Sequence, residues 1–446
     1  MCYNSATVTK NEILLAQKEY LFPAVFHYFD EPLVIDHAKN QFVYDIDGNE
    51  YLDFFGGIVT VSVGHCNETV TAKTRAQLEK LQHVSTVFAT EPQVALAQKV
   101  ASISPGGGAL KKSFFTNSGT EANEVAILAA RLYTGSHEIV ALRHSYHGRS
   151  ALAMSVTAQS SWRITDTLPG GVVHAHNAYC YRCPFGLTYP SCEVRCAQDI
   201  KELIQTTTSG RIAGFIAEPI QGVGGFITPP KEYFGIIADV VRQHGGIIIS
   251  DEVQTGWGRT GTKWFGMEHW DVVPDVITGA KSLANGLPIG ITTARPEVAD
   301  AVKGVTLSTF GGNPVTNVQA KAVIDYIDEN QLMVNAAETG GYLKERLLEL
   351  QEKYAIIGEV RGMGFLLGIE LVEDRKTKVP AKAATNAIMM AARDQRILIG
   401  KGGTNGNVIR CTPPMNISKS DVDEFIPRLD RAFAQVTAPV LVGAKS

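Results

Sequence analysis

The chain has 446 residues, of which 45% are apolar and 19% are charged, and its formal net charge is −4. This composition is ordinary for a globular enzyme, and the length predicts two or three domains. A small negative charge without a long basic run argues against a nucleic-acid or acidic-membrane partner, and no apolar run approaches the length of a membrane span. The N-terminal stretch MCYNSATVTKNEILLAQ lacks the pattern of a secretory signal, so we expect a cytoplasmic protein.

Residues 1–60 are expected to form an N-terminal arm and a small sheet that packs with a C-terminal domain. The stretch FHYFDEPLVIDHAKNQFVYDIDGNEYLDF alternates apolar and polar residues and contains an Asp-Gly pair, which is typical of a hairpin turn. Gly57 closes a Phe-Phe-Gly-Gly sequence. It indicates either a turn after a packed strand or a main chain that passes close to a bound substrate.

Residues 61–315 alternate helical and strand-like patterns, which predicts a large α/β domain with a mainly parallel sheet. Ser118, Gly119 and Thr120 form a turn between an apolar strand and a helix that starts near Glu121. The free N–H groups at the start of a helix bind anions, and a glycine there lets a phosphate approach the main chain. The alternative is a capping box between Ser118 and Glu121.

Two further side chains follow apolar strands in this domain. Tyr146 comes shortly after the strand EIVAL, and Glu218 ends the strand in GRIAGFIAEP. Such positions lie at the edge of an α/β sheet where ligands bind. Taken by itself, Tyr146 is better explained as a core tyrosine.

Four of the seven cysteines lie close together in the irregular stretch 160–200. Cys180, Cys183, Cys192 and Cys196 have the spacing C-x2-C-x8-C-x3-C, which resembles a zinc ligand set. The central spacing is shorter than in most zinc fingers, so the match is weak. Buried free thiols are the alternative, and disulfides are the less favoured one.

Asp251 and Lys281 each follow a short apolar run, and the two runs are spaced like neighbouring strands of one βαβ unit. Because the carboxyl ends of parallel strands meet at one edge of a sheet, the acid and the amine should face each other there. This pair suits a Schiff base between Lys281 and pyridoxal phosphate, with Asp251 on the pyridinium nitrogen. The alternative for the pair alone is a surface lysine and a strand-end aspartate.

Residues 316–446 are expected to form a smaller α+β domain, because two long helical patterns lead into the alternating stretch IIGEVRGMGFLLGIELVED. Arg410 lies in the apolar strand VIRCTPP, and a buried arginine needs a partner. A guanidinium group matches a carboxylate with two parallel hydrogen bonds. Arg259, by contrast, is expected to be a charge on a surface turn.

Three stretches resemble the class III (ω-type) aminotransferases, which are fold-type I pyridoxal-phosphate enzymes. They are SDEVQTGWGRTG at 250–261, DVITGAKSLANGLPIG at 275–290 and STFGGNP at 308–314. Within the class, FFGGIVTVSVGHCN at 54–67 and KGGTNGNVIRCTPPM at 401–415 are most similar to type 2 alanine–glyoxylate aminotransferase. The resemblance implies a mainly parallel central sheet in the large domain and a smaller α+β domain. The four-cysteine set departs from the type 2 enzymes.

The resemblance also implies a role for each site residue. The residues that it assigns to the cofactor are Ser118, Gly119, Thr120, Tyr146, Glu218, Asp251, Gln254, Lys281 and Thr309. Of these, Lys281 and Asp251 would be catalytic, and Thr309 would bind the phosphate of the other subunit's cofactor. Arg410 would bind the substrate carboxylate, with Gly57 beside the substrate.

The activity implied by the resemblance is transfer of an amino group to a 2-keto acid such as pyruvate or glyoxylate. The donor would be an amino acid or ω-amine such as alanine or β-alanine. The active unit would be a homodimer with shared sites, or a tetramer of such dimers. Val223 stands where ornithine and GABA aminotransferases carry a glutamate that masks the substrate arginine. A phospholyase of amino-alcohol phosphates and a non-catalytic cofactor-binding module are the alternative hypotheses.

Overall fold

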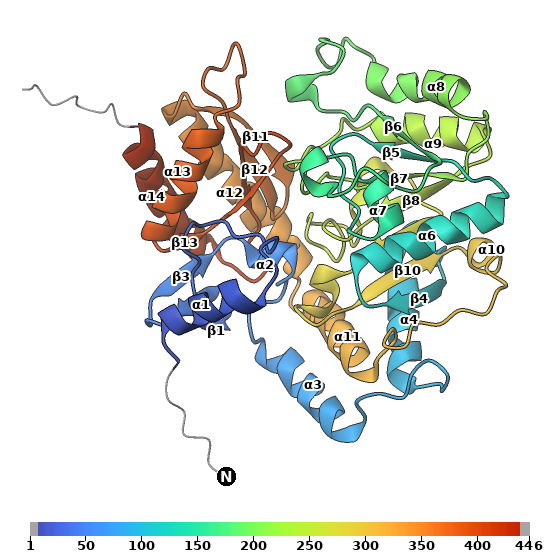
Figure 1. Cartoon of the computed structure of the whole chain (residues 1–446), viewed down its shortest axis with the longest axis horizontal. Coiled ribbons are helices and arrows are strands. Elements are labelled where there is room, and N and C mark those ends of the chain that lie inside the picture. The colour runs from blue at the N-terminus through green and yellow to red at the C-terminus, as the bar shows by residue number, and fades with distance from the viewer. Residues whose placement is uncertain (1–7, 438–446) are drawn as a thin grey trace, which may run out of the picture.

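The computed structural model describes residues 8–437 and contains three β-sheets flanked by helices (Figure 1). The central sheet has seven strands in the order β4-β10-β9-β8-β7-β5-β6. Their bounds, in that order, are Lys112–Thr116, Gly290–Ala294, Val276–Gly279, Ile247–Asp251, Gly214–Ala217, Ile139–Leu142 and Val172–Ala175. Five of them, β9 to β6, run parallel, and β10 is antiparallel to both of its neighbours. The predicted α/β architecture with a mainly parallel sheet is therefore confirmed.

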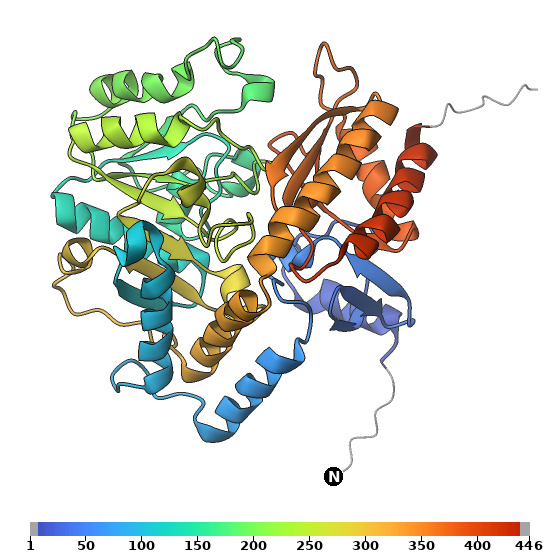
Figure 2. The same cartoon turned by 180° about the vertical axis from the view of Figure 1, so that it is seen from behind.

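Helices cover both faces of the central sheet, as Figures 1 and 2 show from opposite sides. One face packs against α6 (Gly119–Thr134), α7 (Ala151–Val156) and α10 (Pro296–Ala299), and the other against α8 (Arg195–Thr207) and α9 (Tyr233–Gln243). Because both faces are covered, every residue of β8 and β9 is buried. Buried parallel strands read as continuous apolar runs, which explains why these two were recognisable in the sequence.

Helix α6 carries sequence signals at both of its ends. Its N-cap is Ser118, whose side chain accepts a hydrogen bond from the N–H of Glu121. It ends at Gly135, whose φ of 67° lies in the left-handed region that glycine adopts without strain. The helix therefore starts at the turn that the sequence marked as an anion site.

Two smaller four-stranded sheets lie beside the central one. The N-terminal sheet contains β1 (Ile35–Lys39), β2 (Phe42–Asp45), β3 (Glu50–Asp53) and β13 (Ile397–Leu398). The C-terminal sheet contains β11 (Ile357–Met363), β12 (Leu366–Leu371), β15 (Val408–Cys411) and β14 (Gly400–Gly402). Strand β13 pairs in parallel with β3, so the arm and the C-terminal segment share a sheet. The pairing places the arm beside the C-terminal segment, and the division at residues 60 and 315 stays a prediction.

The remaining helices connect these sheets. They are α1 (Lys10–Tyr20), α2 (Gly56–Val59), α3 (Glu68–Lys80), α4 (Glu91–Ile103), α5 (Pro105–Gly108), α11 (Pro314–Glu329), α12 (Leu332–Lys353), α13 (Lys382–Asp394) and α14 (Lys419–Thr437). A continuous apolar core joins α3, α4 and α11 to the C-terminal sheet and its helices. The site described next lies where the strands of the central sheet end and the small sheets begin.

Candidate active site

A cavity of about 360 Å³ lies at the carboxyl ends of β8 and β9. Its size is in the range of small-molecule sites. Eight of the residues singled out in the sequence line it together, namely Ser118, Gly119, Thr120, Tyr146, Glu218, Asp251, Gln254 and Lys281. Residues that follow separate strands in the sequence are therefore brought together in one cavity wall.

Asp251 is the last residue of β8 and is buried. Its Oδ2 accepts hydrogen bonds from His147 Nδ1 at 2.7 Å and from Asn123 Nδ2 at 2.8 Å. Its Oδ1 accepts the N–H of Val253 at 3.1 Å. Because a carboxylate only accepts hydrogen bonds, the proton between Asp251 and His147 is on His147 Nδ1. The aspartate is thereby fixed in one orientation before any ligand binds.

Lys281 follows β9 in a strained turn, with a φ of 44° in the left-handed region. Hydrogen bonds connect this turn to the last residue of α2 and to the segment that follows α2. Ser282 Oγ donates to the carbonyl of Val59 at 2.8 Å, and Asn285 Oδ1 accepts the N–H groups of Ser62 at 2.7 Å and Val63 at 3.0 Å. These bonds hold the lysine side chain toward the cavity.

The Lys281 amine is primed to lose a proton near neutral pH. Burial lowers its pKa to about 8, and the nearby charge of Arg410 acts in the same direction. Asp251 and Glu218 oppose this shift, but Asp251 is paired with His147 rather than with the lysine. A neutral amine is both a nucleophile and a base, so the site can support either kind of chemistry.

The turn at the start of α6 forms the opposite wall. The capping box is only half formed, because the Glu121 carboxylate accepts the N–H of Asn117 at 2.9 Å instead of that of Ser118. A Cβ atom on Gly119 would come within 2.9 Å of the Val253 side chain, so the main chain lies tightly against the cavity wall. The first N–H groups of a helix lack intrahelical partners and attract anions.

The hydroxyl of Thr120 is engaged with the loop that follows β5. It lies 2.7 Å from Ser150 Oγ and accepts the N–H groups of Arg149 and Ser150, both at 3.1 Å. Gly148 packs so closely on Thr120 that an added Cβ would lie 2.3 Å from this hydroxyl. Thr120 therefore also positions the loop that carries Tyr146 and His147.

Glu218 is a buried acid next to that loop. Its Oε1 accepts the N–H of Tyr146 at 2.9 Å and its Oε2 accepts that of Gly222 at 2.8 Å. Burial raises the pKa of Glu218 to about 7, against the opposing effect of His147. The Tyr146 ring meets Trp162 edge-on at 5.4 Å. Glu218 thus fixes the main chain below Tyr146 and titrates near neutral pH.

Arg410 joins the small domain to this wall. Its Nη2 donates to Gln254 Oε1 at 2.6 Å, and its guanidinium carbon lies 4.6 Å from the centre of the Phe226 ring. Arg410 is buried, and its Nε has no hydrogen-bond partner among the described residues. Burial also lowers its pKa, although it stays a cation at neutral pH. A buried cation without a carboxylate partner is suited to an anionic ligand.

Three of the predicted residues, namely Arg410, Gly57 and Thr309, are not among those that line the cavity. Gly57 is exposed with a φ of 56°, and Thr60 reaches the cavity wall instead. Thr309 is exposed on the segment between α10 and α11. Its neighbour Ser308 accepts a hydrogen bond from Asn117 Nδ2 at 3.2 Å, so this segment passes the rim of the cavity.

The expectation of a surface charge at Arg259 is wrong. Its side chain is fully buried and donates to the carbonyls of Pro413 at 2.7 Å and Val61 at 3.0 Å. Burial lowers the pKa of Arg259 to about 9. Two main-chain segments that are distant in sequence provide its partners, and no local pattern signals such an arrangement.

The four cysteines are free thiols, and the weak zinc candidate finds no support. Between residues 8 and 437 no group of three or more His, Cys, Asp or Glu side chains is arranged to hold a metal ion. Cys180 is exposed, whereas Cys183, Cys192 and Cys196 are partly buried.

Sequence reasoning also missed functional partners. The sequence patterns assign no role to His147 or to Asn123. Both bind Asp251, and Thr278 Oγ1 in turn donates to Asn123 Oδ1 at 2.7 Å. The only available signal was that His147 lies in the same strand-end segment as Tyr146.

Comparison with known proteins settles the family. The sequence pattern described as Aminotransferase class-III matches residues 27–433. The chain belongs to the class III aminotransferase family. It is 44% identical over 425 residues to alanine–glyoxylate aminotransferase 2 homolog 2 of Arabidopsis thaliana, covering 95% of this chain and 87% of that protein. It is also 37% identical over 434 residues to a leucine/methionine racemase of Thermococcus litoralis, covering 96% of both.

Solved structures agree with this family assignment. An (S)-enantioselective ω-transaminase from Thermomicrobium roseum superposes with a TM-score of 0.88 at 33% identity, covering 96% of this chain and 99% of that one. The fold-type I architecture and the prediction of an aminotransferase are confirmed, and the phospholyase alternative is not favoured. None of the helices between residues 8 and 437 is long and apolar enough to cross a bilayer.

The expected cytoplasmic location is contradicted. The Arabidopsis relative and two further relatives with the alanine–glyoxylate aminotransferase 2 name are all named as mitochondrial proteins. The expectation rested only on the lack of a secretory pattern in the first residues, and such a pattern does not distinguish these compartments.

Proposed function

We propose that the cavity at β8 and β9 binds pyridoxal phosphate and that the chain transfers amino groups from an amine donor to a 2-keto acid. The fit rests on three features of the cavity. The start of α6 offers free N–H groups to a phosphate, Asp251 offers a fixed carboxylate to a ring nitrogen, and Lys281 offers an amine of lowered pKa. When bound, the cofactor would supply an aldehyde for the amino group and a ring that takes up electrons.

The protein side of the reaction follows from the fixed geometry. Lys281 Nζ, as a neutral amine, would hold the cofactor through its aldehyde and would serve as the base and acid that moves a proton at the reacting carbon of the substrate. Asp251, held by His147 and Asn123, would keep a proton on the ring nitrogen through its negative charge. Tyr146 would lie against the ring, and Gln254 would donate to its phenolic oxygen.

The substrate side is proposed to involve Arg410. Its cationic side chain is close enough to Lys281 to lower the pKa of that amine. We propose that the carboxylate of the keto acid binds this guanidinium and draws the Gln254 contact away from it. Val223 carries no charge to mask the arginine, so 2-keto acids such as pyruvate or glyoxylate are the proposed acceptors. The relatives named alanine–glyoxylate aminotransferases make alanine a suitable first donor to test.

The active unit is proposed to be a homodimer. Thr309 is exposed beside Phe310, Leu307 and Val305, which are large apolar side chains left open to solvent in the single chain. A second subunit that covers them would allow Thr309 to reach the phosphate of the partner's cofactor. A contact of this kind makes cofactor affinity depend on dimerisation.

The single observation that carries this proposal is the fixed Asp251 opposite the Lys281 amine in one cavity. A half-reaction test examines it directly. Purified enzyme with cofactor is mixed with alanine, β-alanine and other amines without an acceptor, and the lysine-bound cofactor absorbance is followed. We expect that absorbance to fall and a keto product to appear in equal amount. No response to any amine would refute the proposal.

A racemase is the second candidate, because the Thermococcus relative has that activity in its name. The two reactions differ in their products. A racemase inverts a single enantiomer of leucine or methionine without an acceptor and without forming a keto acid. Chiral chromatography of the same incubations distinguishes them, and inversion without keto acid would favour the racemase.

A further inference from the structure

Four cysteines line one small cavity, three of them between β6 and α8 and Cys196 in the first turn of α8. Cys180, Cys183, Cys192 and Cys196 share it with Tyr189 and other side chains of the same segment. We refer to residues 177–195 as the cysteine loop. Nothing in the proposed transamination uses these thiols, since the loop contributes no residue to the cofactor cavity.

The cysteine loop has little regular structure of its own. Its main chain makes local turns, with the N–H of Arg182 bonded to the carbonyl of Tyr179, that of Gly186 to Cys183 and that of Cys192 to Thr188. A segment held only by local turns opens more easily than a strand or a long helix. The loop therefore depends on side chains to fix it to the rest of the protein.

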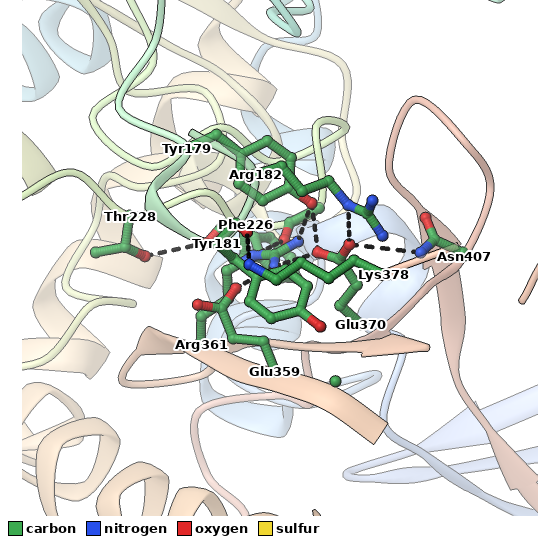
Figure 3. A network of polar contacts seen from close by, with 12 residues as sticks. Tyr179, Tyr181, Arg182, Phe226, Thr228, Glu359, Arg361, Glu370, Lys378 and Asn407 are labelled. Carbon is green, nitrogen blue, oxygen red and sulfur yellow. Dashed lines mark hydrogen bonds and ion pairs between the residues drawn. The ribbon is translucent and has the colours of Figure 1, made fainter. Parts of the chain in front are cut away.

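Those side-chain anchors converge on the C-terminal sheet (Figure 3). Tyr179 and Arg182, on either side of Cys180, both donate to the buried carboxylate of Glu370 on β12. Lys378 Nζ donates to the carbonyl of Tyr181 at 2.7 Å. Cys180 thus lies in the one short stretch of the loop that is bound to the small domain, while Cys192 lies in its less anchored second half.

The thiols are close enough to influence each other. Burial raises the pKa of Cys180, and charge on Cys192 and then on Cys183 raises it further. Burial also raises the pKa of Cys196 to about 12, which makes this thiol a poor nucleophile. No three of these groups are arranged to hold a metal among residues 8–437, whereas two thiols that share a cavity are the reactants of a disulfide.

We propose that Cys180 and Cys192 form a thiol–disulfide exchange site whose oxidised form braces the cysteine loop. The oxidant is a low-molecular-weight disulfide of the glutathione type. The thiolate of one cysteine attacks the small disulfide, forms a mixed disulfide and releases one thiol. The thiolate of the other cysteine then attacks the protein sulfur of that mixed disulfide and releases the second. Two protein thiols are oxidised and lose two protons, and one small disulfide is reduced to two thiols.

The sequence allows a direct test by peptide mapping. Trypsin cleaves after Arg163, Arg182, Arg195 and Lys201, which puts Cys180 on one peptide, Cys183 with Cys192 on the next, and Cys196 on a third. The holoenzyme is incubated with oxidised glutathione, its remaining thiols are alkylated, and it is digested without reduction. We expect the first two peptides to be joined, and reduction to separate them again.

Three serine variants identify the pair. In Cys192→Ser the joined peptides should disappear and Cys180 should retain one glutathione instead. In Cys183→Ser, whose cysteine lies on the same peptide as Cys192, the cross-link should persist. Cys66→Ser removes an exposed thiol elsewhere and should change nothing at the loop. A cross-link that survives in Cys192→Ser, or glutathione found only at Cys66, would overturn the proposal.

The bracing effect has its own readout. Native trypsin cleavage after Arg182 requires the loop to open, because Arg182 is bound to Glu370. Closing the loop with a disulfide should slow this cleavage roughly ten-fold in the oxidised wild type, and not in Cys192→Ser treated in the same way. Equal cleavage rates in oxidised and reduced wild type would show that the cross-link does not brace the loop and would overturn that part of the proposal.

Discussion

Two buried carboxylates, Asp251 in the cofactor cavity and Glu370 on the C-terminal sheet, are held in different ways. Asp251 accepts from a histidine, an amide and a main-chain N–H. Glu370 accepts from two guanidinium groups, with Arg361 Nη1 and Arg182 Nε both at 2.5 Å, and from the hydroxyl of Tyr179. Figure 3 shows these donors gathered around Glu370.

The difference lies in where the positive charges are. At Glu370 the guanidinium groups face the carboxylate, so the charges neutralise each other inside the protein. In the cofactor cavity Lys281 and Arg410 have no carboxylate within ion-pair distance among the described residues, and Asp251 is paired with His147. Unpaired buried charge costs stability, and a ligand of complementary charge offsets that cost. The charges at the cofactor cavity are therefore arranged to bind a ligand, whereas the charges around Glu370 stabilise the fold.

The largest effect should come from removing the cavity amine. Lys281→Ala should lower turnover by about 10³-fold or more and abolish the absorbance of the lysine-bound cofactor, because no other residue can form that bond. Both are measured by spectrophotometry on purified enzyme with added cofactor. Lys303→Ala, at an exposed lysine, is the control and should behave as wild type. Full activity in Lys281→Ala would remove the proposed mechanism.

Glu370→Gln should instead destabilise the fold. Leaving the buried Arg361 and the partly exposed Arg182 beside a neutral amide should cost about 3 kcal/mol of unfolding free energy, measured by urea unfolding at pH 7. Glu359→Gln is the matched control, since Glu359 also pairs with Arg361 at 2.5 Å but is partly exposed. Its cost should be below about 1 kcal/mol. Equal losses of unfolding free energy in the two variants would show that burial of the carboxylate does not determine how much an ion pair contributes.

The Glu370 effect should also depend on pH. Burial raises the pKa of Glu370, but the charge of Arg361 and the hydrogen bonds of Tyr179 and Arg182 outweigh burial and leave it below the usual value of 4.5. A carboxyl group whose pKa is lower in the folded than in the unfolded protein stabilises the fold at pH values above its unfolded pKa. That contribution is lost as the pH falls through the folded pKa. The difference between wild type and Glu370→Gln should therefore narrow in unfolding curves taken below about pH 4.5.

Asp251→Asn should mainly lower turnover, at some cost in stability because the amide Nδ2 would face the His147 and Asn123 donors. The amide keeps a partner for the Val253 N–H but carries no charge to hold a proton on the cofactor ring, so kcat should fall about 10²-fold. Steady-state kinetics should show KM changing much less than kcat. Asp275→Asn is the matched control, because Asp275 binds the N–H of Ile248 outside the cavity. If that control lost as much activity, the effect would be structural.

The parts of this molecule that could be predicted from sequence are those encoded locally. Asp251 and Lys281 follow buried apolar runs, and the edge of a parallel sheet brings such positions together. Helix α6 could be placed in the same way, from a serine at its start and a glycine at its end. The long motifs around these residues resemble one family, which the comparisons confirm.

The parts that could not be predicted depend on contacts between distant segments. His147 reaches Asp251 across more than a hundred residues, and Arg259 is satisfied by carbonyls of Val61 and Pro413. No periodicity or spacing reports such partners, because they exist only once the sheet and the small domain have packed. The sequence therefore predicts a surface position for Arg259, since burial of an arginine is uncommon without a partner nearby in the sequence.

Arg410→Lys should produce the smallest of these changes. It tests whether the cation at the cofactor cavity binds a ligand carboxylate, in contrast to the arginines that pair with Glu370. An ammonium group keeps the charge but loses the two-pronged match to a carboxylate and the contact over the Phe226 ring. The KM for the keto acid should rise about 10- to 100-fold, with a smaller change in kcat. The half-reaction of an amine without a carboxylate should be nearly unaffected, which provides an internal control. An unchanged KM for the keto acid would mean that its carboxylate binds elsewhere, and the unpaired guanidinium would then need another explanation.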